Sequence, residues 1–293
     1  MPQEAPGGGD RWSSRLELNA PLFDSLSLRI ADRAEGAGGF PTARLKRGLL
    51  LFDHGQDLTE EGVGFGVPVL KQGTRTIFPG RLELAQRREG AVWEAAATFH
   101  MNLVERLAGA GGGSPKSGAF YAVRDSLAAL HRRLPILRGP LTATSNAVRR
   151  RLGWVTTFEE TESLGAVTVT YNVHGDEGRV HTTVDPTELP AKGVTEVVVM
   201  NELGARHFER YVDSDGASLR GAEVGTWDEV AAETASFVCA ASGVGFSLGQ
   251  VAGARLYRGW ELVGSRLAWA GFGYRLPPTM MAFAYDLNVT RTP

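Results

Sequence analysis

The feature that most constrains this chain is a two-residue alternation of apolar and polar side chains. A period of two places successive side chains on opposite faces of a β-strand. Runs of this kind recur along the sequence and end at Gly, Pro, Asn or Asp, residues that favour turns. They occupy residues 14–20, 25–31, 66–73, 81–86, 166–173, 179–184, 195–202, 254–263 and 282–290. The sequence therefore predicts a protein built mainly of β-strands.

The spacing of these runs also indicates how the strands connect. The 37 glycines of the chain separate the runs at short intervals, as hairpin connections require. Strands and helices do not alternate regularly, so a parallel, doubly wound sheet is excluded. We predict a large antiparallel β-sandwich with a short helical insert. The alternative is a curved, half-closed barrel, because glycines inside strands also permit strong curvature.

The helical insert is expected at residues 114–153. Apolar side chains recur there at intervals of three and four residues, which predicts an amphipathic helix over about 118–134. A second short helix is expected from Thr144 or Ser145 to Gly153. The chain then divides into a β-rich part at 1–113, the helical connector at 114–153 and a β-rich part at 154–293. These β-rich parts are either two domains or two halves of one sandwich.

Composition narrows the function classes. The 293 residues are 43% hydrophobic and carry a formal net charge of -2, which fits a soluble folded protein and does not favour nucleic acid. Signal-peptide and membrane-spanning patterns are absent from the sequence, so we expect a cytoplasmic protein with no membrane span. Cys239 is the one cysteine, which excludes an intrachain disulfide framework. The sequence contains no recognisable cofactor or metal motif, and we expect neither.

A basic segment stands out against this average. Between Asp125 and Glu159 the sequence contains no carboxylate but six arginines, which include Arg149, Arg150 and Arg151. Guanidinium groups bind carboxylate, sulfate or phosphate groups in a bidentate manner, so these three residues are candidate ligands for an anion. The alternative is a solvated helix face that pairs with the acidic residues 159–162.

Two histidines flank a polar turn at residues 175–178. A four-residue loop there pairs Val173 with Val180 on an apolar face of the hairpin. The polar face then carries His174 opposite Arg179, and Asn172 opposite His181. We list His174 and His181 as candidate catalytic residues, with Asn172 and Arg179 as ligand-binding residues. A polar sheet face that is merely hydrated gives the same pattern.

Other candidates come from the following strand and from the aromatic residues near the C-terminus. Glu202 and His207 are the nearest acid–base groups to complete a site with the two histidines. Trp260 and Trp269 are expected on adjacent strands, where indole rings stack on sugars or build the core.

Two functions follow from these patterns. The first is a carbohydrate-active β-sandwich, a glycoside hydrolase or polysaccharide lyase with a polar sheet-face cleft for an oligosaccharide, anionic if the arginines bind it. The second is a non-catalytic binding protein for an apolar or lipid-like ligand with an anionic headgroup. Reaction type, substrate and oligomeric state do not follow from the sequence.

Overall fold

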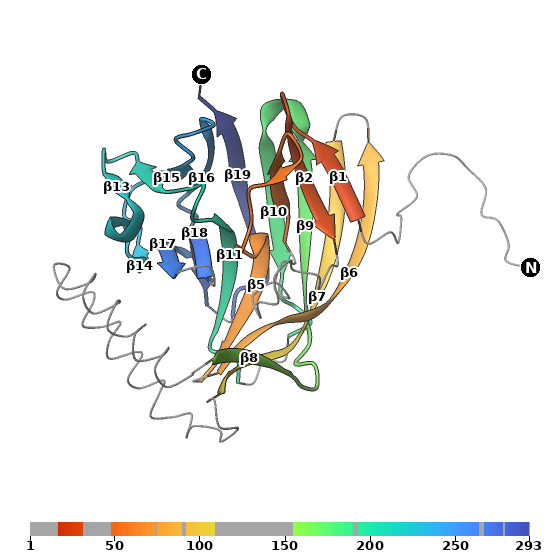
Figure 1. Cartoon of the computed structure of the whole chain (residues 1–293). Coiled ribbons are helices and arrows are strands. Elements are labelled where there is room, and N and C mark those ends of the chain that lie inside the picture. The colour runs from red at the N-terminus through yellow and green to blue at the C-terminus, as the bar shows by residue number, and fades with distance from the viewer. Residues whose placement is uncertain are drawn as a thin grey trace, which may run out of the picture.

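The computed structural model describes the residues 17–31, 48–73, 75–89, 92–108, 155–189, 193–263, 267–277 and 279–292 (Figure 1). The regular secondary structure of the described chain is almost entirely β-strand, and its helical turns are two short 3-10 helices, η3 (Gly175–Glu177) and η4 (Gly221–Val224). The helices predicted within 114–153, with Arg149, Arg150 and Arg151, lie outside the described residues. No helix of the described chain has the length and apolar content needed to cross a membrane.

The main element is one antiparallel sheet of 15 strands. In the order of the sheet, the strands are β13 (Ser218–Arg220), β12 (Arg210–Asp213), β15 (Thr234–Val238), β16 (Val244–Gly249), β19 (Phe283–Arg291), β10 (Arg179–Asp185), β9 (Ala166–His174), β7 (Val92–Ala108), β6 (Arg75–Glu89), β5 (Gly64–Gln72), β11 (Glu196–Gly204), β18 (Leu267–Leu276), β17 (Arg255–Val263) and β14 (Thr226–Glu229), and β8 (Val155–Glu160) pairs with β7. Strands from before and after residues 109–154 are therefore neighbours in one sheet.

This sheet folds over to form a sandwich of two layers. Strands β5 and β6 pair only near their shared hairpin and then diverge. Layer A consists of β5, β11, β18, β17 and β14. Layer B consists of β6, β7, β9, β10, β19, β16, β15, β12 and β13. The Tyr171 hydroxyl of layer B donates to the Phe65 carbonyl of layer A at 3.1 Å, and the Tyr285 hydroxyl donates to Asn201 Oδ1 at 2.9 Å. These contacts across the interior confirm the predicted antiparallel β-sandwich.

The two strands at the ends of this order, β13 and β14, are consecutive in the chain. Only η4 and Gly225 lie between them. The sheet thus curls until its ends meet at η4, but the described residues show no pairing of β13 with β14. At this end Arg258 Nη1 of layer A donates to the Tyr211 hydroxyl of layer B at 3.1 Å. The architecture is a strongly curved sandwich and not a closed barrel.

A small second sheet covers part of the interior. It contains β1 (Glu17–Pro21), β2 (Leu26–Ala31), β3 (Leu50–Asp53) and β4 (Gln56–Asp57). Leu26, Leu28 and Leu51 are buried in the same apolar cluster as the two layers, so this sheet closes the core on one side. Figure 1 shows β1 and β2 lying across β9 and β10.

The space between the layers is filled by apolar and aromatic side chains. Ring centroids of Phe237 and Phe272 lie 4.9 Å apart, and those of Phe208 and Phe246 lie 5.2 Å apart. Cys239 is buried in this cluster. Because alternate side chains point into this core, the remaining side chains of each layer form an outer face. The two outer faces lie on opposite sides of the sandwich.

Candidate functional site

The predicted hairpin is found on the outer face of layer B. Strands β9 and β10 pair His174 with Arg179 and Asn172 with His181, which confirms the expected register. Val173 and Val180 are fully buried on the other face. His181 Nδ1 lies 2.8 Å from Asp286 Oδ1, and these side chains are 43% and 47% exposed. This surface consists of open, solvated pairs and has no described covering layer that would form a cleft.

Glu202 occupies a different environment, on the outer face of layer A. It lies opposite Gly64 of β5 and Gly271 of β18, and Gly271 lies opposite Gly259 of β17. The three neighbouring positions in this row therefore lack side chains. A carboxyl group at the centre of a row of glycines has space around it that ordinary strand neighbours would fill.

Two tryptophan rings lie over glycine positions on this face. The ring centroids of Trp227 and Trp269 are 5.5 Å apart, with an angle of 33° between the planes. A Cβ atom on Gly273 would lie 2.4 Å from the Trp227 ring, and one on Gly259 would lie 2.4 Å from the Trp269 ring. Both rings therefore rest on the sheet only because those positions are glycine.

The backbone at Trp227 is unusual. Its φ is +61°, a left-handed conformation, and it lies where the pairing of β14 with β17 shifts register between Thr226 and Asp228. Such a conformation costs a non-glycine residue about 1–2 kcal/mol. The bulge turns the indole ring over Gly273 and against Trp269. Strained residues of this kind occur preferentially at binding and catalytic sites.

The protonation of Glu202 follows from its burial. Its side chain is 5% exposed, and burial raises the pKa of Glu202 to about 8, with a further increase from the nearby Glu261 carboxylate. A hydrogen bond from the Val63 backbone N–H acts in the opposite direction. Trp269 Nε1 donates to Glu261 Oε2 at 3.3 Å. At neutral pH this face thus contains a buried, protonated carboxyl group within electrostatic reach of the Glu261 carboxylate, which an indole holds in place.

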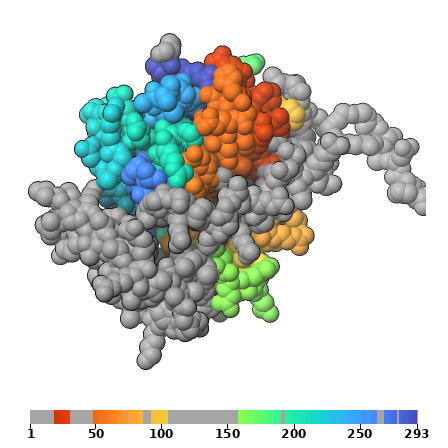
Figure 2. All heavy atoms as spheres, in the orientation of Figure 1, coloured from red at the N-terminus to blue at the C-terminus, as the bar shows by residue number. Residues whose placement is uncertain are grey.

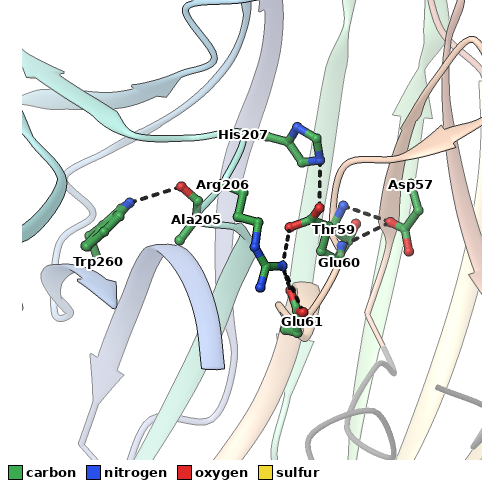
Figure 3. Close-up of polar contacts among 8 residues, drawn as sticks. All are labelled: Asp57, Thr59, Glu60, Glu61, Ala205, Arg206, His207 and Trp260. Carbon is green, nitrogen blue, oxygen red and sulfur yellow. Dashed lines mark hydrogen bonds and ion pairs between the residues drawn. The ribbon is translucent and has the colours of Figure 1, made fainter. Parts of the chain in front are cut away.

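A cluster of charged side chains joins the loop after β4 to the turn after β11 (Figure 3). His207 Nε2 lies 3.1 Å from Glu60 Oε1, and Arg206 Nη1 lies 3.0 Å from Glu61 Oε1. The Glu60 backbone, with φ +43°, is fixed by its N–H, which donates to Asp57 Oδ1 at 3.3 Å.

The loop that carries Glu60 lies directly over the end of β11. The Gly204 N–H donates to the Leu58 carbonyl at 3.0 Å, and Figure 2 shows the orange surface of the β3–β5 region adjoining the turquoise surface around β11. A Cβ atom on Gly204 would lie 2.9 Å from Glu60 Oε2. Since Gly204 is two residues from Glu202 on the same face, the Glu60 carboxylate adjoins the Glu202 site.

The structure separates the predicted site residues into two groups. Glu202, His207 and Trp269 lie together at layer A. The hairpin residues lie on the outer face of layer B, across the core from Glu202; they are Asn172, His174, Arg179 and His181. The structure therefore does not bring the hairpin histidines together with Glu202 and His207.

Trp260 and Trp269 do lie on adjacent strands, but on opposite faces. Trp260 pairs with Ala270, and its Nε1 donates to the Ala205 carbonyl at 3.2 Å (Figure 3). The partner of Trp269 is instead Trp227. Sequence reasoning missed Trp227 and Glu261. The one signal for them was the Gly-apolar-Gly pattern at 270–278, which indicates strand positions where another group approaches the backbone closely.

Comparison with known proteins gives limited similarity. No protein-family model matches the chain, and no curated protein matches it. Among solved structures, an alpha-N-acetylgalactosaminidase from Bifidobacterium bifidum, in complex with Gal-NHAc-DNJ, aligns with a TM-score of 0.48 at 10% identity over 94% of this chain and 36% of its own. Its ligand-free form gives 0.46 at 7% identity over the same shares. An alpha-mannosidase from Enterococcus faecalis gives 0.42 at 10% identity, over 99% of this chain and 31% of its own. The chain thus spans about a third of each of these enzymes.

Proposed function

We propose that this protein is carbohydrate-active and that it binds and hydrolyses a glycan on the outer face of layer A. The observation that carries the proposal is the buried, protonated Glu202 within electrostatic reach of Glu261, on the same sheet face as the adjoining rings of Trp227 and Trp269. A pair of carboxyl groups in different environments, one of which holds its proton at neutral pH, is the arrangement used to cleave glycosidic bonds.

The two carboxyl groups take different roles in this proposal. Glu202 donates its proton to the glycosidic oxygen as the bond from that oxygen to the anomeric carbon breaks. Glu261 lies nearer to solvent and stabilises the positive charge that develops on the sugar, or attacks the anomeric carbon. Water then supplies the hydroxyl group of the product and returns a proton to Glu202. The partly exposed Trp227 indole provides a flat apolar surface against which a sugar ring packs, and the buried Trp269 ring supports it from below.

A direct test compares variants on a panel of aryl glycosides and oligosaccharides. Glu202→Gln keeps the shape of the protonated side chain but removes the acid, and we expect kcat/KM to fall at least about 100-fold. Trp227→Gly removes the ring without imposing strain on a left-handed position, and we expect KM to rise about tenfold with little change in kcat. Glu177→Gln, an exposed glutamate next to the hairpin on layer B, is the matched control and should retain full activity.

Two results would refute the proposal. One is the absence of binding and turnover of every glycoside in the panel by the wild-type protein. The other is wild-type activity in Glu202→Gln and in Glu261→Gln.

The alternative function, binding of an apolar ligand between the layers, has less support. The aromatic residues near the C-terminus, which would line such a cavity, pack against each other instead. The ring centroids of Tyr274 and Tyr285 are 4.9 Å apart, and those of Tyr274 and Phe283 are 5.0 Å apart. The Tyr274 hydroxyl also donates to the Gly249 carbonyl at 2.6 Å. These side chains stabilise the core.

A further inference from the structure

A depression of about 510 Å³ lies at the far end of layer A, where β11 and β17 begin and β18 ends. Its lining includes Glu196, Arg255 and Arg275, together with the backbone around Gly253 and Pro277. Two arginines and one glutamate give this lining a net positive charge. Anionic groups are therefore favoured in it.

The two arginines are direct cross-strand partners. Arg255 of β17 pairs with Arg275 of β18 in the sheet register. Like charges in that position repel each other and destabilise a sheet. Glu196 offsets only one of them, since its Oε1 lies 2.9 Å from Arg275 Nε, and Arg255 makes no ion pair with any residue that the structure describes. An anion bound between the two guanidinium groups would remove the repulsion.

Arg275 is held in place for such a contact. Its guanidinium carbon lies 4.8 Å from the centroid of the Tyr257 ring, in addition to the ion pair with Glu196. Hydrogen bonding to Tyr257 and the charge of Glu196 raise the pKa of Arg275, against the effect of burial. A guanidinium that is already oriented loses little conformational freedom when it binds a planar anion.

The depression lies on the same face as the proposed glycan site. Arg275, Gly273 and Gly271 point to one side of β18, and Gly271 is opposite Glu202. Four residues of strand separate Arg275 from Gly271, which corresponds to about 14 Å. Tyr257, opposite Gly273, lies between the two positions. Because the Trp227 ring covers Gly273, an oligosaccharide that extends from the arginines towards Glu202 would pass over that ring.

We propose that Arg255 and Arg275 form a subsite for a carboxylate or sulfate group of an acidic oligosaccharide. This inference rests on the proposed glycan function and specifies its substrate class. The sugar that carries the charge binds over the arginines, while a neighbouring sugar of the same oligosaccharide lies over Trp227. The subsite favours acidic glycans over neutral ones of equal length.

The test uses calorimetric titration of the full-length protein with three probes: sodium sulfate, a galacturonate trimer, and the galactose trimer that lacks its carboxylates. Arg255→Gln is the main variant, because Arg255 is exposed and its loss leaves no buried charge unpaired. We expect it to weaken the galacturonate trimer about tenfold or more and to abolish sulfate binding, with galactose-trimer affinity unchanged. Arg81→Gln, an exposed arginine paired with Glu83 at 2.8 Å, is the control and should bind like wild type.

The possible failures are distinguishable. Equal affinity of the wild type for both trimers, unchanged in Arg255→Gln, overturns the acidic subsite and leaves the glycan function intact. If the wild type binds neither trimer, the glycan function and the assignment of the depression to a sugar are both refuted, whether or not sulfate binds. An equal loss of affinity for both trimers in Arg255→Gln also overturns the subsite, since it shows a general structural effect.

Discussion

The two outer faces of the sandwich have the same alternating sequence pattern but different chemistry. On layer B the polar side chains form open pairs such as His181 with Asp286, each nearly half exposed. On layer A Glu202 is 5% exposed and Trp269 is 6% exposed, although both are on the side away from the main core. Water solvates the first face and is largely excluded from the second.

Glycines account for much of this difference. Gly259, Gly271 and Gly273 lie around Glu202 on layer A, and the indole rings use the space over Gly259 and Gly273. On layer B the corresponding neighbours of His181 are Asn172 and Asp286, whose own side chains hold it at the surface. A polar face becomes a candidate site where missing side chains let large rings and a carboxyl group pack together.

The largest expected effect is on stability at Trp269. Trp269→Ala removes a buried ring and its contact with Trp227, so the free energy of unfolding should fall by about 3–5 kcal/mol. His174→Ala on layer B should change it by less than about 0.5 kcal/mol. Urea denaturation of both variants measures the difference, and equal effects would contradict the contrast between the faces.

The second effect concerns pH. The pKa of Glu202 is about 8 in the folded protein and close to 4.5 when the chain unfolds. The folded state binds the extra proton between these values, so this stabilisation is complete below pH 4.5 and is lost as pH rises through 8. We compare the unfolding free energy of the wild type with that of Glu202→Gln, which does not titrate. The wild-type value minus the variant value should fall by about 4 kcal/mol between pH 5 and pH 9. A difference that does not vary with pH would show that Glu202 titrates normally.

A smaller effect is expected in the cluster beside the site. Glu60 contacts both His207 and Arg206, and these side chains are partly exposed. A double-mutant cycle with Glu60→Ala and His207→Ala should give a coupling energy of about 1 kcal/mol. The measurement is equilibrium denaturation of the four proteins, and additive effects would exclude a direct interaction.

The smallest effect is expected for the exposed pair on layer B. The cycle with His181→Ala and Asp286→Ala should give a coupling energy below about 0.5 kcal/mol, and 0.5 M salt should remove it. A coupling larger than that of Glu60 with His207 would mean that the layer B pair is better shielded than its exposure indicates.

The sequence predicted local structure better than it predicted the site. Alternation and turn chemistry act over a few residues, so the antiparallel sandwich and the pairing of His174 with Arg179 were accessible. The pairing of distant strands was not, because no local signal shows that the core separates the hairpin from Glu202. Glu202 was proposed as an acid–base group from its place in the following strand region, but its proximity to Glu261 depends on a register between β11, β18 and β17.

Trp227 illustrates a second limit. Its ring reaches the site through a bulge with a positive φ, which a tryptophan adopts only when tertiary packing compensates for the strain. The sequence placed Trp260 and Trp269 on adjacent strands, as observed, but it left open which faces they occupy. Residues that pair across a hairpin share a face only when their register matches, and Trp260 pairs with Ala270.

The meeting of the sheet's two ends at η4 has a consequence for solubility. Exposed edges of a sheet are templates for pairing with other molecules, and short edge strands reduce that risk. Here β13 has three residues and β14 has four, and both belong to one continuous stretch, Ser218–Glu229. A single short segment thus limits pairing with other molecules at both ends of the strand order from β13 to β14.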